Sequence, residues 1–451
     1  MNPTPTGKAT KINLFSLGTP QMRAFHLSWF SFFLCFIGWF GIAPLMAIVR
    51  EDLQLTQEQI GNTIIASVAI TILARLLCGW LCDKYGPRIT YTGLLIFGAF
   101  PVMLIGFADS YEAFLLSRLG IGAIGAAFVI TQYHTSVMFS SNIVGTANAT
   151  TAGWGNLGGG VTQILMPLIF GLFLAVGLTE TLSWRVAMVV PGAAMIIIGV
   201  LYYKFTQDYP EGNLSELKKL DPRFQKRSDD SSKSFMSALK DRRVLALTLI
   251  YGACFGVELT INNIAALYFI DYFGMNLTTA GLIAASFGLM NIFARPLGGI
   301  LGDKCGVKFG LNGRVYFLAT VLFIEGLTLM LFSQMSWLPL AIATLVLFSL
   351  FVQMAEGATY CVVPFINRKA LGPVSGIVGA GGNMGAVAAG FLFRNMDYQD
   401  ALLYLGVMVT IISFSALLVK FTKAEFKQED DDQKFREQEE EKSRIAMPEM
   451  A

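Results

Sequence analysis

Charged residues are scarce in this chain, and their scarcity excludes most classes of soluble protein. Only 14% of its 451 residues are charged, whereas 54% are hydrophobic and the mean hydropathy is +0.58. An ordinary soluble domain is about 25% charged. One globular core cannot hide so much apolar surface, so lipid must be the solvent for most of the chain.

Histidine and cysteine are too few and too scattered for the sites that they often form. The chain has two histidines, His26 and His134, and six cysteines that lie in or beside apolar runs without paired spacing. A histidine-rich metal site and a disulfide framework are therefore not expected. We also find no basic stripe, nucleotide motif or nucleophile–base pair, and so predict no enzyme activity, cofactor, bound metal or nucleic-acid partner.

Long apolar stretches are what the chain has instead. Twelve of them are long enough to cross the roughly 30 Å hydrocarbon layer of a bilayer. They lie near 24–49, 61–82, 89–108, 113–138, 146–177, 185–206, 244–272, 278–302, 315–334, 337–361, 370–393 and 399–422. The sequence thus predicts an all-α membrane protein with twelve transmembrane helices.

Positive charge marks one side of the membrane. Lysine and arginine cluster in the central stretch 207–243 and in short loops at 83–88, 303–314 and 367–369. By the positive-inside rule, both termini and the central loop are cytoplasmic. The first twenty-odd residues lack the apolar core of a signal peptide, so we expect the first span to direct the chain to the membrane, which we predict to be the plasma membrane.

The predicted topology divides the chain into five segments. They are a cytoplasmic N-terminal segment (1–23), an N-terminal six-helix half (24–206), a cytoplasmic central loop (207–243), a C-terminal six-helix half (244–422) and an acidic cytoplasmic tail (423–451).

The two halves carry an internal repeat. The stretch ARLLCGWLCDKYGPR at 74–88 aligns without gaps on ARPLGGILGDKCGVK at 294–308, with eight of fifteen positions identical. A weaker repeat sets GWGNLGG at 153–159 against AGGNMGA at 380–386. Repeated halves are typical of transporters, which bind their substrate at the interface near the midplane.

Two arginines, Arg75 and Arg295, occupy equivalent positions in the repeat and lie well inside their spans. An intramembrane arginine costs roughly 2.5–3.5 kcal/mol on insertion scales, so it normally faces a polar cavity or a partner. One interpretation pairs each arginine with a carboxylate of its own half. Their equivalence favours another, in which both face one cavity and their donor forks bind a planar oxyanion.

Glycines and charged residues recur at the cytoplasmic ends of the repeated helices, in the pattern Gly-x-x-x-Asp-Lys-x-Gly-x-basic. A related pattern, Arg118-x-x-x-Gly-x-x-Gly, lies on the fourth span. Glycines allow helices to approach closely, and charged groups can latch them. The set resembles motifs of the major facilitator superfamily, which implies two pseudo-symmetric six-helix halves. It also implies gating roles for Gly79, Asp83, Arg88, Gly299 and Asp303.

Each glycine-rich run of the weaker repeat contains one asparagine, Asn156 in the first half and Asn383 in the second. Close helix packing accounts for most of the glycines. An unpaired amide is costly in lipid, so the asparagines need a further explanation. We interpret them as amide donors that face the anion cavity.

Five longer segments carry a more specific pattern. They are FHLSWFSFF (25–33), GTANATTAGWGNLGGGVTQILMPL (145–168), LIYGACFGVELTINN (249–263), FARPLGG (293–299) and SGIVGAGGNMG (375–385). These segments resemble the nitrate/nitrite porter family, and within it the high-affinity nitrate transporters of plants and algae. The resemblance covers residues from about 12 to 425 and leaves out the C-terminal tail.

The resemblance implies which residues hold the substrate. Arg75 and Arg295 match the pair that holds nitrate, and Tyr251 matches an aromatic residue that adds a hydroxyl donor. Asn156, Phe128 and Phe255 match positions that line the site, where phenyl rings would sandwich the flat anion; ordinary packing is the alternative for the rings.

Proton coupling is assigned to Glu258 together with Arg118. Glu258 follows Tyr251 by seven residues on the same helix face, and buried carboxylates can cycle protons. The resemblance also implies an acidic residue here in proton symporters. The alternative is a structural partner for a buried arginine, and the two roles overlap if protonation releases that arginine. Glu325 and Glu356 also lie within spans but do not match the family pattern.

We therefore predict a proton-coupled importer of nitrate and nitrite that works by alternating access. Alternatives are a nitrate/nitrite exchanger, a nitrite exporter or a nitrate-sensing homologue; the GGNMG run disfavours exchange, because bacterial exchangers differ there. Predicted partners are nitrate, nitrite, protons and membrane lipid, and the small accessory membrane protein that plant relatives use is a further candidate.

Overall fold

The computed structural model describes residues 7–139, 143–220, 231–366, 371–422 and 425–426. In this part of the chain, twelve helices are long and apolar enough to cross a membrane. The predicted all-α fold with twelve spans is therefore confirmed. Part of the central loop (221–230) and nearly all of the acidic tail lie outside the described residues, as do residues 1–6.

The first half of the chain forms six spans. Its helices are α1 (Pro20–Phe40), α2 (Met46–Leu53), α3 (Gln57–Tyr85), α4 (Pro87–Leu104), α5 (Tyr111–Gly122), α6 (Ala127–Met138), α7 (Val144–Ala175), α8 (Glu180–Ala187) and α9 (Val189–Phe205). Short 3₁₀ turns join consecutive helices within two of the spans, η1 (Ala43–Leu45) and η3 (Ala123–Ala126), and η2 (Ile105–Phe107) ends the third span.

The second half follows α10 (Leu214–Leu220) and α11 (Ser231–Lys240). Its elements are α12 (Arg242–Phe273), α13 (Leu277–Leu289), η6 (Met290–Ile292), α14 (Ala294–Ser333), α15 (Leu338–Val362), η7 (Val363–Phe365), α16 (Leu371–Asn395), α17 (Tyr398–Ser413) and η9 (Phe414–Leu418). Gly310, with φ of 69°, breaks α14 and separates the eighth span from the ninth.

Several spans begin earlier than hydropathy predicts, and two of them show how a polar cap extends a helix. The first starts at Pro20 and the sixth at Glu180, rather than at 24 and 185. In both, the threonine before the helix accepts a hydrogen bond from a first-turn N–H, of Met22 and of Leu182 respectively. Such caps satisfy donors that have no partner within the helix.

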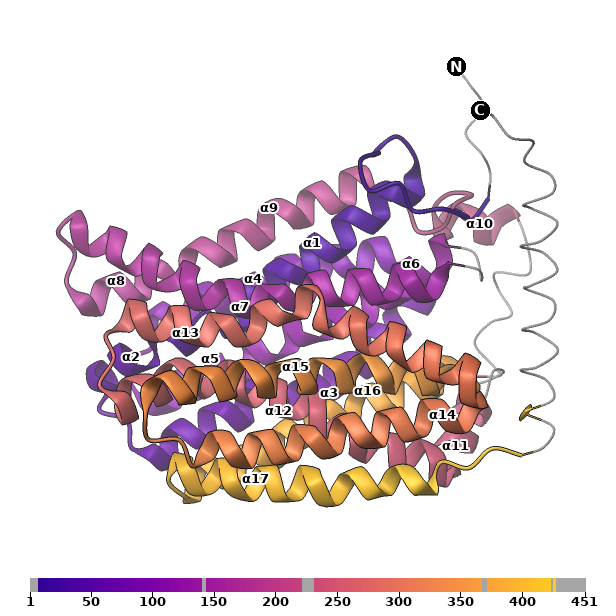
Figure 1. Cartoon of the computed structure of the whole chain (residues 1–451). Helices are drawn as coiled ribbons and strands as arrows, with labels where there is room; N and C mark the ends of the chain where they lie inside the picture. The colour runs from indigo at the N-terminus through magenta and orange to yellow at the C-terminus, as the bar shows by residue number, and fades with distance from the viewer. Residues whose placement is uncertain (1–6, 140–142, 221–230, 367–370, 423–424, 427–451) are drawn as a thin grey trace, which may run out of the picture.

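The helices run side by side, so the bundle has two ends (Figure 1). The segments α10 and α11 lie at one end, which we name the terminal end; α2 and α8 lie at the other, the distal end. The two halves meet where α3 packs along α16 and α7 along α13.

The halves touch through their backbones near the middle of the spans, and through ion pairs at the distal end. A Cβ atom placed on Gly160 of α7 would lie 2.6 Å from the amide nitrogen of Leu289. Arg50 of α2 forms a two-bond ion pair with Asp271 of α12, at 2.6 and 2.7 Å. Glu58 of α3 pairs with Arg394 of α16. The described conformation is thus closed at the distal end.

Toward the terminal end, the halves leave space between them. A cavity of about 350 Å³ opens there. It is lined by Ile12, Leu14, Ala149, Thr150, Gly153, Trp154 and Pro296, which come from the N-terminal segment, α7 and α14.

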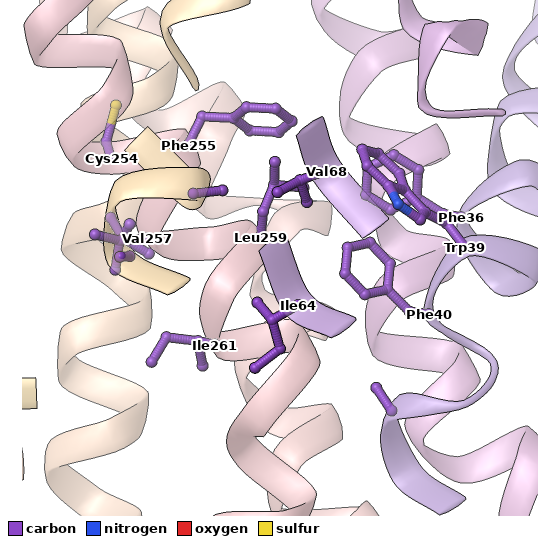
Figure 2. Packing of buried hydrophobic residues seen from close by; sticks show 14 of the residues in the cluster. Phe36, Trp39, Phe40, Ile64, Val68, Cys254, Phe255, Val257, Leu259 and Ile261 are labelled. Carbon is purple, nitrogen blue, oxygen red and sulfur yellow. The ribbon is translucent and has the colours of Figure 1, made fainter. Parts of the chain in front are cut away.

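The core that joins the halves is apolar and aromatic. Phe36, Trp39 and Phe40 of α1 lie on one side of α3, and Leu259 of α12 lies on the other, with Val68 between them (Figure 2). Large apolar side chains also face outward, where lipid would cover them. Examples are Phe97, Phe107 and Leu116, which are 74%, 78% and 70% exposed.

The glycine contact between the halves generates a first prediction. Gly160→Ala places a methyl group against the backbone of α13, and overpacking of this kind typically costs about 1–3 kcal/mol. We expect a lower thermal unfolding midpoint for the purified protein and a distal end that an engineered surface thiol reports as more open to labelling.

Gly171 lies on the same helix, and a methyl group there would meet no atom within 4 Å. Gly171→Ala is therefore the matched control. It should keep or raise the midpoint, because alanine is the better helix former by about 1 kcal/mol. Equal midpoints in the two variants would contradict the proposed close contact.

Candidate functional site

Arg75 of α3 reaches from the first half into the second. Its side chain is buried, and its Nη1 donates to the carbonyl oxygen of Gly379 on α16 at 2.8 Å. Its Nε lies 3.5 Å from the carbonyl oxygen of Gly125. Among the described residues, Nη2 has no hydrogen-bond partner and no carboxylate pairs with this arginine. Arg75 therefore keeps a positive charge and a free donor at the interface.

Arg295 of α14 is buried to the same extent but is bound differently. Its Nη2 donates to the hydroxyl of Tyr251 at 2.9 Å, and its Nη1 lies 2.6 Å from Oε2 of Glu356 on α15. The contact with Glu356 is a close ion pair that lacks the alignment of a hydrogen bond. The own-half carboxylate weighed above as an alternative thus exists for Arg295.

The crossing of α14 and α15 brings Glu356 to Arg295. A Cβ on Gly357 would collide with the carbonyl oxygen of Arg295, and one on Gly298 would collide with Met354. Only glycine lets the two backbones come so close. The residue before Gly357 therefore lies directly beside the arginine.

The eighth span is interrupted just before Arg295. Helix α13 ends at Leu289, η6 follows, and α14 begins at Ala294. Arg295 consequently lies in the first turn of a new helix, where the helix dipole favours negative charge. Discontinuous helices of this kind often build the anion sites of transporters.

Aromatic rings surround both guanidinium groups. The Arg75 guanidinium lies 5.2 Å from the ring centre of Phe128 and 5.7 Å from that of Phe255. The Arg295 guanidinium lies 6.0 Å from the same Phe255 ring. Since both arginines face one ring, they share one compartment. Positive charge is stabilised over aromatic faces at such distances.

Two tyrosines complete this compartment. Tyr251 stacks on Phe255 with ring centres 5.2 Å apart, and Tyr360 of α15 meets Tyr251 edge-on at 5.2 Å. The hydroxyl of Tyr360 is buried and has no described hydrogen-bond partner. It interacts electrostatically with both arginines. A free hydroxyl and a free guanidinium donor therefore line the same space.

Glu258 of α12 lies near Arg295, and its carboxyl group accepts hydrogen bonds from both halves. Its Oε1 accepts a hydrogen bond from Asn291 at 2.6 Å, and its Oε2 accepts one from Asn156 of α7 at 3.4 Å. The carboxyl groups of Glu258 and Glu356 lie near enough to interact electrostatically. Two adjacent carboxylates repel each other.

Arg118 and Asn383 form no hydrogen bond with this carboxyl pair in the described part of the chain. Arg118 of α5 donates to the amide oxygen of Asn263 at 2.8 Å and to the carbonyl of Trp39 at 3.2 Å. Asn383 is fully buried, and neither amide atom has a hydrogen-bond partner among the described residues. Arg118 thus links the halves through an amide, and the roles predicted for both residues remain predictions.

The residues of the gating motif make contacts within their own halves. Arg88 donates through Nε to the carbonyl of Tyr203 at 2.8 Å, and its backbone N–H donates to Asp208 at 2.9 Å. Burial raises the pKa of the Asp208 carboxyl, although the backbone donors of Leu214 and Arg88 oppose that effect. Arg88 therefore ties α4 to the start of the central segment.

In the second copy of the motif, Asp303 pairs with Arg314 across the break at Gly310. A Cβ on Gly79 or on Gly299 would meet its nearest neighbour at 3.9 Å, which is ordinary contact. In this conformation neither glycine is needed for close approach. The side chain of Asp83 lies outside the described residues.

Sequence reasoning missed three members of the site. Glu356 was set aside because it does not match the family pattern, and Tyr360 and Asn291 were not considered. Glycine spacing offered one signal for Glu356, since Gly357 on α15 and Gly298 on α14 are the contact between those helices. No pattern in the chain signalled the position of Tyr360.

The groups that line the compartment suit a small, flat anion. It offers two guanidinium groups, one from each half, and hydroxyl groups from two tyrosines, with an aromatic ring facing both cations. Charge-assisted donors in a planar fork match a planar oxyanion.

Comparison with known proteins identifies relatives along most of the chain. Residues 28–368 and 252–446 match the family model described as Major Facilitator Superfamily. The "High affinity nitrate transporter 2.5" of Arabidopsis thaliana is 43% identical over 92% of this chain and 82% of its own length. "Nitrate transporter 2.1" of Chlamydomonas reinhardtii is 35% identical over 92% and 77%. A "Nitrate/nitrite transporter NrtP" of Picosynechococcus is 31% identical over 82% and 84%.

Solved structures share the fold at low sequence identity. A bacterial homologue of the human lysosomal transporter Spinster, in an inward-facing and unoccupied conformation, superposes with a TM-score of 0.70 at 16% identity, over 91% of this chain and 98% of its own. A variant of the nucleoside transporter NupG gives a TM-score of 0.65 at 12% identity, over 88% and 99%.

The bonds around Glu258 generate a second prediction. Asn291→Leu keeps the volume of the side chain but removes the 2.6 Å donor to a buried carboxyl oxygen, and leaving such an acceptor unsatisfied typically costs about 1–3 kcal/mol. We expect a clearly lower thermal unfolding midpoint of the purified protein.

Asn395→Leu is the control, because that amide donates only to the carbonyl of Phe391 at the exposed end of α16. Its midpoint should stay close to that of the unaltered protein. An Asn291 variant as stable as this control would show that the bond to Glu258 contributes nothing.

Proposed function

Because this chain belongs to the nitrate/nitrite porter family of the Major Facilitator Superfamily, we propose that it imports nitrate, and also nitrite, into the cell. Transport proceeds by alternating access across the plasma membrane, with both termini and the central loop in the cytoplasm. In this orientation the terminal end of the bundle faces inward, and the cavity beside α7 and α14 lies on the cytoplasmic side.

One observation carries the proposal: an arginine from each half faces the same aromatic ring. Arg75 and Arg295 both lie within 6.0 Å of the Phe255 ring centre. An anion that bridges them would bind to both halves at once, and so would link its own binding to their movement. Arg75 retains an unpartnered Nη2 for this purpose.

The shape of the compartment favours nitrate among anions. Phe128 and Phe255 present ring faces to the guanidinium groups, and the tyrosine hydroxyls add donors. A flat ion with three oxygen atoms can accept from several donors in one plane while the rings exclude water. Nitrite has the same charge and a smaller planar frame, which is the reason for including it.

Energetics require coupling to a second ion. Moving a monovalent anion into a cell with a negative interior opposes the membrane potential by roughly 2.3 kcal/mol per 100 mV. One proton per nitrate makes transport electroneutral, and two make import electrogenic and strongly driven. We propose at least two, with Glu258 as a proton site because its carboxyl is buried beside the anion compartment.

Nitrate/nitrite exchange is the competing function, since two arginines alone would serve it. The deciding assay measures labelled nitrate uptake into proteoliposomes, with and without an inward proton gradient, and with internal nitrite as a separate arm. Nitrate uptake that depends on the inward proton gradient supports import. Uptake that needs internal nitrite and ignores the gradient would replace import by exchange, and binding without flux would favour a sensor.

The guanidinium fork provides a third prediction. Arg295→Lys keeps the charge but loses the planar pair of donors, so nitrate affinity should fall at least about tenfold, as measured by the half-saturating concentration for uptake. Arg242→Lys, at an exposed position at the start of α12, is the control and should leave uptake unchanged. Unaltered affinity in the Arg295 variant would refute the assigned role.

Proton stoichiometry provides a fourth prediction. With two or more protons per nitrate, each cycle carries net positive charge inward. Adding nitrate at acidic external pH to a cell that expresses the protein should therefore evoke an inward current under voltage clamp. An outward current, or none despite measurable nitrate uptake, would contradict this stoichiometry.

A further inference from the structure

The ion pair between Arg295 and Glu356 blocks one of the two donors that nitrate needs. Oε2 of Glu356 lies 2.6 Å from Nη1 of Arg295, and Glu356 is fully buried. An anion that bridges both arginines has to take that position, because a carboxylate and a nitrate cannot occupy the same guanidinium edge.

We propose that Glu356 is the proton-linked counter-ion of Arg295: as a carboxylate it occupies Arg295, and on taking a proton it gives up the guanidinium edge to nitrate. This assignment rests on the proposed function and deepens it, since it names the group through which proton and anion binding are linked.

Because Glu356 is buried, it has to take up a proton when nitrate displaces it from Arg295. A carboxylate displaced from Arg295 would be an uncompensated charge in a dry compartment, next to a second anion. Protonation removes that charge. Nitrate binding therefore favours the protonated form of Glu356, and by linkage a lower pH favours nitrate binding.

Other groups that face Glu356 do not offer it a second cation. The titratable and charged groups around it are Tyr251, Cys254 and Glu258 of α12, Arg295 and Glu325 of α14, and Tyr360 of α15. Arg295 is the cation in this set. Release from Arg295 thus leaves the carboxyl with acidic and neutral neighbours, which favours its protonated form.

The two carboxyl groups of the pair are not equivalent. Both oxygens of Glu258 accept hydrogen bonds from amides, one from each half of the bundle. Neither oxygen of Glu356 accepts a hydrogen bond from a described amide or hydroxyl group. Glu258 is therefore held in place by amides, whereas Glu356 is held by its ion pair with Arg295.

The test measures nitrate affinity of the purified protein by calorimetric titration across a pH series from about 5 to about 8. For the unaltered protein, one linked proton predicts affinity that rises by up to about tenfold for each unit by which the pH falls. Glu356→Gln has the same shape and cannot ionise, so its affinity should depend on pH less steeply than that of the unaltered protein, by one linked proton. At the alkaline end it should bind nitrate more tightly than the unaltered protein.

Glu325→Gln is the matched control. Glu325 is a fully buried glutamate of the same half whose carboxyl has no described hydrogen-bond partner and pairs with neither arginine. Its variant should keep the pH dependence. A Glu356→Gln protein that keeps the full dependence, or a Glu258→Gln protein that alone loses it, would overturn the proposal.

A second measurement needs no variant. Adding nitrate to the unaltered protein in weakly buffered detergent solution should draw protons from the medium, which a pH-indicator dye records. No uptake, or proton release, would overturn the proposal even if the Glu356 variant fails to fold. Failure of the unaltered protein to bind nitrate at any pH would instead reject the proposed function.

Discussion

A guanidinium group inside a membrane protein has to be satisfied by a counter-ion, by other polar or aromatic groups of the protein or by a bound anion, and this requirement organises the structure. Two such groups, Arg75 and Arg295, lie in one aromatic compartment and meet the requirement in different ways. Arg295 has a carboxylate of its own half. Arg75 has carbonyl oxygens and a ring face, and it keeps one donor without a partner in the described chain. In this conformation Arg295 is therefore occupied by a carboxylate, whereas Arg75 still offers one donor.

The helices around the compartment are shaped to keep these groups at short range. Gly357 lets α15 lie against the backbone of Arg295, and the interruption before Ala294 places that arginine in the first turn of α14. Near mid-length, Gly160 brings α7 against α13, while ion pairs such as Arg50–Asp271 join the halves at the distal end. Small residues thus fix how closely neighbouring helices pack in this conformation. Charged pairs between the halves can separate without loss of that packing.

Much of the fold follows from the sequence, because lipid imposes simple rules. Twelve spans could be predicted from hydropathy alone, and errors in their bounds arose where a polar cap such as Thr19 or Thr179 extended a helix. The gapless repeat placed Arg75 and Arg295 at equivalent depths, which is why their convergence could be anticipated. Repeat symmetry fixes backbone positions, and both arginines sit on the repeated segment.

The partners of those arginines could not be predicted in the same way. Glu356 and Tyr360 belong to α15, where no repeated motif marks a counterpart in the first half. Their nearness to the arginines depends on how α14 and α15 cross. Glycine contacts set that crossing, but the sequence alone does not tell which residues face each glycine. Asn291 lies in the 3₁₀ turn between α13 and α14, and hydropathy treats that span as continuous.

The proposed import cycle requires the carrier to return without its cargo, and the Arg295–Glu356 pair bears on that step. A carrier whose pocket held two bare cations would resist closing around them, since nothing would offset their repulsion as water left. A carboxylate from within the protein can stand in for the missing ion during this half of the cycle. The unloaded carrier would then reorient with a nearly balanced interior, and the turnover rate would depend on how readily Glu356 resumes its place.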